Sequence, residues 1–211
     1  MTELDHLAAL RGEVVAFTGA LRGANLDAPV ASCPGWTVRD LAGHLTGVHR
    51  WATLALDDAG PPAYDETPDD DPVAAYASAA QSLLDRLAEL PADAPAWTFD
   101  KTNRTAGFWR RRQLHEVWVH RWDLEQFEGF HVALAVDGIE EVVDFFLPRQ
   151  IALGRTELPA GSLRLVTPQR EWRVGDGPET VVAGAAGELL LRLWGRGEPL
   201  PGPWTDVALT P

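Results

Sequence analysis

The sequence predicts a mainly α protein, with a four-helix bundle followed by a small α/β C-terminal domain. Apolar residues recur at helical spacing in four long segments of the first 130 or so residues, and short β-favouring runs parted by Pro and Gly follow later. With 211 residues, 45% of them hydrophobic and 23% charged, the chain has ample material for a core. We expect the bundle in residues 1–135 and the α/β domain in residues 136–211.

The first two helices are predicted from their periodicity and their ends. Leu, Val and Phe recur at helical spacing over residues 3–22, before a stretch that contains Gly and Pro. The second helix has a sharper start, because Thr37 and Asp40 stand at the spacing of a reciprocal capping pair. We expect this helix to extend to about Asp57.

Two further helices complete the predicted bundle. The segment 60–72 is rich in proline and acidic residues, which favours a solvated loop. A third helix is expected at about 73–90 and a fourth near 107–129, again after a connection containing several prolines. Four helices with such connections are typical of a bundle.

The C-terminal part alternates helical and β-favouring segments. Its predicted elements are a helix over 138–153, strands at 162–166, 170–175 and 179–184, and a helix at about 185–194. The tail from Gly197 is too rich in proline for a helix, and we expect it to follow the surface and end in a short edge strand.

Charge and composition exclude several classes of protein. A net charge of −13 and a pI near 4.8 argue against binding to a phosphate backbone. The sequence has no run of about 18 apolar residues and no signal-peptide pattern at its N-terminus, so we expect a cytoplasmic protein with neither nucleic acid nor membrane as partner. The single cysteine, Cys33, rules out an internal disulfide and a Cys-rich zinc finger. Any metal must therefore be held by histidine and carboxylate.

Three residues form a candidate site for a divalent metal. Glu116 and His120 are four residues apart on the fourth helix, so their Cβ atoms lie about 5–6 Å apart on one face. His44 falls at the margin of the apolar stripe of the second helix and points inward. Three protein ligands leave a zinc ion one open position, as in catalytic sites.

Other side chains compete for these roles. A single inward histidine is more often a hydrogen-bonded core residue than a ligand, and His49 and His115 are rival ligands of lower rank. Asp40 and Asp123 are candidates to orient the imidazoles of the ligands, although Asp40 serves equally well as a helix cap. Glu116 itself lies on an inward face, where a carboxylate must be paired or bound to metal.

Two more residues of the fourth helix are assigned to cofactor binding. Arg112 lies one turn before Glu116, and it is the member of the run Arg110–Arg112 that best faces the site. Trp109 shares the direction of Glu116 and His120 on the helical wheel.

Three motifs carry a resemblance to a known family. CPGWTVRDLAGHL, HEVWVHRWDLE and ETVVAGAAGELLLRLWGR together resemble the mycothiol-dependent maleylpyruvate isomerase family, within the DinB-like metalloprotein superfamily. The resemblance implies a DinB-like bundle that binds zinc through His44, Glu116 and His120. It also implies mycothiol or a similar low-molecular-weight thiol as cofactor, and an assisting arginine of the C-terminal domain, for which Arg196 and Arg192 are the candidates.

The implied chemistry is activation of a thiol by the metal. A metal-activated thiol could isomerise a maleylpyruvate-like substrate or transfer sulfur to an electrophile. We expect an external thiol in this role, because Cys33 lies before a capped helix start that rises about 10–11 Å to His44. Two alternatives stay open: a non-catalytic metal-binding or stress-response module, and a metal-dependent hydrolase with Asp123 as general base.

Overall fold

The computed structural model describes residues 4–57, 60–65, 67 and 69–210. The chain forms two compact units that meet in the sequence between Phe127 and Glu128. The division into domains at residue 135 stays a prediction. The mainly α fold class, a bundle followed by a small α/β part, is confirmed.

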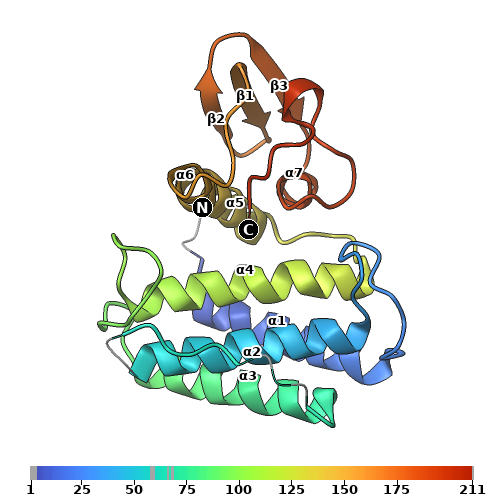
Figure 1. Ribbon diagram of the computed structural model, residues 1–211, viewed down its shortest axis with the longest axis vertical. Helices are drawn as coiled ribbons and strands as arrows, with labels where there is room; N and C mark the ends of the chain where they lie inside the picture. The colour runs from blue at the N-terminus through green and yellow to red at the C-terminus, as the bar shows by residue number, and fades with distance from the viewer. Residues whose placement is uncertain (1–3, 58–59, 66, 68, 211) are drawn as a thin grey trace. The chain divides into compact units, whose positions relative to one another are not determined.

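Four helices that run side by side build the first unit (Figure 1). Over its described residues these are α1 (His6–Gly23), α2 (Val38–Asp57), α3 (Pro72–Glu89) and α4 (Ala106–Glu125). Helix α1 packs against α4 and α3, and α2 packs against α3 and α4. The bundle therefore brings α2 and α4, which carry the predicted ligands, into contact.

Side-chain caps fix the helix ends. The predicted capping pair is present: Asp40 accepts from the Thr37 backbone N–H at 2.8 Å, and Thr37 Oγ1 accepts from the Asp40 N–H at 3.3 Å. Asp71 caps α3 and Thr105 caps α4. Helix α4 ends before the predicted residue 129, because Gln126 adopts a left-handed conformation with φ of 49°.

An aromatic cluster fills one end of the bundle. Trp109 is fully buried, and its ring centroid lies 5.2 Å from Trp51 and 5.4 Å from Phe108. Its indole N–H donates to the Trp97 carbonyl oxygen at 2.7 Å. Because buried tryptophan is anchored when its N–H finds a partner, this cluster fixes the N-terminal half of α4.

The second unit joins helices to a small sheet. Its described elements are α5 (Val132–Glu141), a π-helical turn (Val142–Phe146), α6 (Leu147–Ala152), β1 (Gly161–Val166), β2 (Glu171–Asp176), β3 (Glu179–Ala183) and α7 (Ala186–Leu193). The strand order is β2-β1-β3, with β1 antiparallel to β2 and parallel to β3. The helix predicted over 138–153 starts earlier, at Val132, because His131 caps it by accepting from the Leu134 N–H.

The C-terminal tail contributes to the core, so the surface prediction was wrong. Trp204 is fully buried, in a short 3₁₀ turn (Gly202–Trp204), and Leu200 and Leu209 are buried as well. The tail forms no strand up to Thr210, whose carbonyl oxygen accepts from the Gln150 side chain at 2.9 Å. The proline content of the tail disfavours an α-helix, but it does not keep apolar side chains out of the core.

In the described part of the chain, no helix is both long enough and apolar enough to cross a membrane.

Candidate metal centre

His44, Glu116 and His120 meet inside the bundle, as the sequence predicted. His44 Nε2 lies 3.0 Å from Glu116 Oε1, and His120 Nε2 lies 3.5 Å from the same oxygen. All three donor atoms lie within 4.8 Å of one another. His44 comes from α2 and the other two come from successive turns of α4. The i,i+4 spacing on α4 brings Glu116 and His120 together, and the packing of α2 on α4 adds His44.

These residues fit a divalent metal in both chemistry and spacing. Ligand atoms about 2.1 Å from a tetrahedral zinc ion stand about 3.4 Å from one another. The observed separations from Glu116 Oε1, 3.0 and 3.5 Å, are close to that value. Two imidazoles and one carboxylate leave a further coordination position for an exogenous ligand.

Arg112 holds the second oxygen of the Glu116 carboxylate. Its Nη2 donates to Glu116 Oε2 at 2.8 Å, and its side chain is only 4% exposed. This contact leaves Oε1 directed at the two histidines, so Glu116 would bind a cation through one oxygen. The structure shows Arg112 as the ion-pair partner of Glu116, and its role in cofactor binding stays a prediction.

Asp123 holds the other side of the His120 ring. His120 Nδ1 lies 2.9 Å from Asp123 Oδ2, and Ser32 Oγ donates to Asp123 Oδ1. An Nδ1–H bonded to a carboxylate leaves Nε2 with the lone pair that binds a metal. The predicted orienting role of Asp123 therefore has a geometric basis. Ser32 was missed, because a serine in a loop 91 residues from its partner gives no sequence signal.

The electrostatics of the set follow from these contacts. Burial alone would raise the pKa of Glu116, but hydrogen bonds with His120 and His44 and the charge of Arg112 hold it well below its usual value. Burial would lower the pKa of His120, yet hydrogen bonding with Asp123, Cys33 and Glu116 raises it to about 10. The Glu116 carboxylate therefore carries a buried negative charge next to His120, and a bound dication would take the place of the His120 proton.

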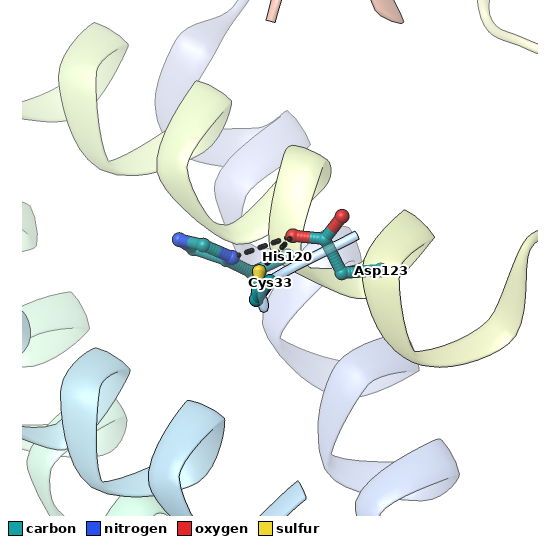
Figure 2. Close-up of side chains that lie close together, drawn as sticks. All are labelled: Cys33, His120 and Asp123. Carbon is teal, nitrogen blue, oxygen red and sulfur yellow. Dashed lines mark hydrogen bonds and ion pairs between the residues drawn. The ribbon is translucent and has the colours of Figure 1, made fainter. Parts of the chain in front are cut away.

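Cys33 lies closer to this set than the sequence suggested. Its Sγ lies 3.4 Å from Asp123 Oδ2, the oxygen that also lies 2.9 Å from His120 Nδ1 (Figure 2). The thiol is half-buried. The rise along α2 separates Cys33 from His44, but the turn before Trp36 brings it beside His120 instead.

The rival histidines have other surroundings. His49 is fully buried, and its Nδ1 lies 2.6 Å from Gln113 Oε1. Burial lowers the pKa of His49 to about 4. His115 is buried on α4, and neither residue belongs to the groups of closely spaced metal-binding side chains found among the described residues.

Three more predicted site residues have defined contacts. Trp109 belongs to the aromatic cluster and has no exposed surface, so it is a core residue in this structure. In the second unit, Arg192 donates to the carbonyl oxygens of Glu198 and Pro199 at 2.9 and 2.7 Å. Arg196 donates to the Trp194 carbonyl oxygen at 2.6 Å. A catalytic role for Arg192 or Arg196 stays a prediction.

A cavity of about 510 Å³ adjoins the set. His44 forms part of its wall, and Trp36, whose ring centroid lies 5.0 Å from that of His44, lies beside it. The described lining residues are Gly35, Trp36, Arg39, Asp40, Gly43, His44, Tyr64, Asp69 and Pro72. Space for a small molecule therefore reaches the candidate ligand His44.

Comparisons with solved structures agree with the fold. The crystal structure of the mycothiol-dependent maleylpyruvate isomerase is similar with a TM-score of 0.72 and 16% identity, covering 98% of this chain and 95% of that one. A mutant of the isomerase gives a TM-score of 0.71 and 15% identity over the same shares. No curated protein matches the chain.

The family comparison covers the helical bundle. The model of the mycothiol maleylpyruvate isomerase N-terminal domain matches residues 7–125. This range holds more than half of the 211 residues and includes His44, Glu116 and His120. The chain therefore belongs to the mycothiol maleylpyruvate isomerase N-terminal domain family.

Proposed function

We propose that the protein is a thiol-dependent enzyme with a divalent metal, zinc in the first instance, held by His44, Glu116 and His120. Its cofactor is mycothiol or a similar low-molecular-weight thiol. It isomerises maleylpyruvate-like substrates or transfers the thiol to an electrophile. The observation that carries this proposal is the convergence of two imidazoles on one oxygen of a buried carboxylate whose other oxygen is bound by Arg112.

The metal set explains how a thiol would be activated. A bound divalent cation supplies a Lewis acid that deprotonates a coordinating thiol at neutral pH. Arg112 keeps Glu116 in place, and Asp123 fixes the tautomer of His120. These contacts hold Glu116 Oε1 and His120 Nε2 on the side of the set that His44 faces.

The proposed reaction needs room and a partner for negative charge. Sulfur adds to the carbon–carbon double bond, the resulting single bond rotates, and elimination of the thiol gives the trans isomer. A transferase would stop after addition. The cavity beside His44 offers space, and Arg39 in its wall is an arginine that a substrate carboxylate could reach.

The proposed reaction also uses an arginine that binds the substrate carboxylate. Arg196 and Arg192 of the second unit remain its candidates, with Arg39 of the cavity as a third. Arg192→Gln, Arg196→Gln and Arg39→Gln would be compared by kcat and KM for a carboxylate substrate. The true partner gives the largest fall in kcat/KM, at unchanged metal content.

The decisive experiment measures turnover of maleylpyruvate with and without added mycothiol, together with metal content. We expect about one divalent metal per chain and activity only when thiol is present. His120→Ala should lose most of both, whereas His6→Ala, on α1 and outside the set, should keep both. Turnover without thiol would favour a hydrolase. Unchanged metal content in His120→Ala would contradict the ligand assignment.

A further inference from the structure

A second group of metal-binding side chains shares His120 with the first. Cys33 Sγ, a ring nitrogen of His120 and a carboxylate oxygen of Asp123 lie within 4.8 Å of one another. His120 Nδ1 lies 2.9 Å and Cys33 Sγ 3.4 Å from Asp123 Oδ2 (Figure 2). Cys33 comes from the loop before α2, and the other two come from α4.

This group differs from the first in chemistry. The first set offers nitrogen and oxygen, whereas this one adds a thiol, which selects softer cations. Asp123 has no exposed side-chain surface, and Ser32 binds its Oδ1. Its Oδ2 is therefore directed toward Cys33 and His120. A sulfur, a nitrogen and an oxygen atom that can each bind a metal ion are thus close enough to share one ion.

We propose that Cys33, His120 and Asp123 form a second metal-binding set, which takes a thiophilic divalent cation through Sγ, Nδ1 and Oδ2. Binding breaks the S–H bond and releases the proton of Cys33 to solvent, because a coordinating thiol is deprotonated. The Nδ1 proton of His120 also leaves, either to solvent or to Nε2 of the same ring.

The two sets exclude one another at His120. A neutral imidazole has one nitrogen with a free lone pair and one that carries a proton. When Nδ1 binds the cation, Nε2 carries the proton and donates toward Glu116 Oε1, 3.5 Å away. His120 is then lost to the set of His44 and Glu116. A thiophilic cation should therefore inhibit the enzyme without occupying its primary site; this consequence, unlike the binding itself, rests on the proposed function.

Cobalt(II) tests the binding directly, because a thiolate ligand gives it a sulfur-to-metal charge-transfer band in the near ultraviolet. The full-length protein is stripped of metal and titrated with Co²⁺ in buffer without thiol. His44→Ala removes a ligand of the first set only. We expect this variant to bind about one Co²⁺ per chain with the charge-transfer band, and to lose the band when Cys33→Ser is added.

The strength of binding gives a second readout. In the His44→Ala background, Cys33→Ser should weaken Co²⁺ binding by at least about tenfold. Cys33→Ala serves if the serine variant is unfolded by circular dichroism. Absence of the band in folded His44→Ala protein would overturn the proposal, as would equal affinity with and without the thiol. Both results are independent of catalysis, so failure of the proposed function would leave them interpretable.

Inhibition tests the competition. Cd²⁺ should inhibit thiol-dependent turnover of the zinc-loaded wild type more strongly than that of Cys33→Ser, by about tenfold in the inhibiting concentration. Equal inhibition of the two proteins would contradict competition at His120.

Discussion

His120 and His49 are buried in the same bundle, yet their pKa values move in opposite directions. The pKa of His120 is raised to about 10, and that of His49 is lowered to about 4. Burial lowers the pKa of both imidazoles. His120 faces the carboxylates of Asp123 and Glu116, whereas the ring of His49 hydrogen-bonds the amide of Gln113. The carboxylate partners, and not the depth of burial, set the two apart.

The difference in hydrogen-bond partners makes His120 suited to a metal site and makes His49 a residue of the core. Carboxylates that stabilise an imidazolium also stabilise a dication in its place. The hydrogen bond with the Gln113 amide also raises the pKa of His49, but by less than burial lowers it, so His49 is neutral at neutral pH and acts in packing. Its nearest aromatic neighbours include Tyr76, with ring centroids 5.4 Å apart. Four substitutions would break or sharpen this comparison.

Glu116→Gln should have the largest effect. The amide keeps the shape of the side chain but removes the charge on which both histidines converge. We expect thiol-dependent activity to fall by at least about 100-fold and most bound metal to be lost. Mutation of groups that only hydrogen-bond a metal ligand lowers affinity or activity by about 10–100-fold, and loss of the ligand itself should cost more. Glu125→Gln, on the same helix and outside the set, is the matched control. Full metal content in the Glu116 variant would show that the carboxylate charge is not required.

His49→Gln should reduce the pH dependence of stability. The folded-state pKa of about 4 lies below the ordinary 6.5, so the unfolded chain binds the additional proton between these values. The contribution of neutral His49 to the free energy of unfolding is fully present above pH 6.5, and it is lost progressively as the pH falls from 6.5 to 4. Between pH 7 and pH 5 this loss amounts to about 2 kcal/mol.

Urea denaturation of wild type and His49→Gln at several pH values measures the difference. The groups that face His49 are Gln113, Glu116 and His44, and all are present in both proteins. A parallel fall in stability for the two proteins would mean that His49 is protonated in the fold, and the contrast with His120 would disappear.

Arg112→Gln should weaken metal binding by about tenfold. The variant keeps a polar side chain but removes the charge that binds Glu116 Oε2. Competition with a chelator gives the affinity, and Arg111→Gln, on a different face of α4, is the control. The free energy of unfolding of the variant should fall more in the metal-free protein than in the metal-bound protein, because a bound cation compensates the charge of Glu116. An affinity unchanged by Arg112→Gln would make the ion pair a packing feature only.

Local rules predicted much of this site. The i,i+4 spacing placed Glu116 and His120 on one face, and the apolar stripe of α2 turned His44 inward. Helical direction alone does not place Trp109 beside Glu116, because seven residues along a helix also amount to a rise of about 10 Å, and Trp109 is buried in the aromatic cluster. Sharing a face is therefore not the same as sharing a site.

Long-range contacts were beyond such rules. Ser32 and Cys33 reach Asp123 from 91 and 90 residues away through a loop whose path is set by tertiary packing. Burial of Trp204 likewise depends on long-range contacts, which cannot be predicted from the proline-rich composition of the tail. For the fold, the periodic helices and β-favouring runs were predictable, whereas the helix start at Val132 depended on an unusual histidine cap.

Tyr76→Phe should have the smallest effect and tests the surroundings of His49. The Tyr76 hydroxyl is buried, as is His49 Nε2, and neither has a hydrogen-bond partner among the described residues. The ring packs on Phe17 with centroids 4.7 Å apart, a contact that phenylalanine keeps. Removing an unpartnered hydroxyl loses no hydrogen bond, so the free energy of unfolding should stay within about 0.5 kcal/mol or rise. Urea denaturation measures it, with the exposed Tyr64→Phe as control. A loss above about 1 kcal/mol would show that the hydroxyl is hydrogen-bonded through an ordered water, and the environment of His49 would then be polar, as that of His120 is.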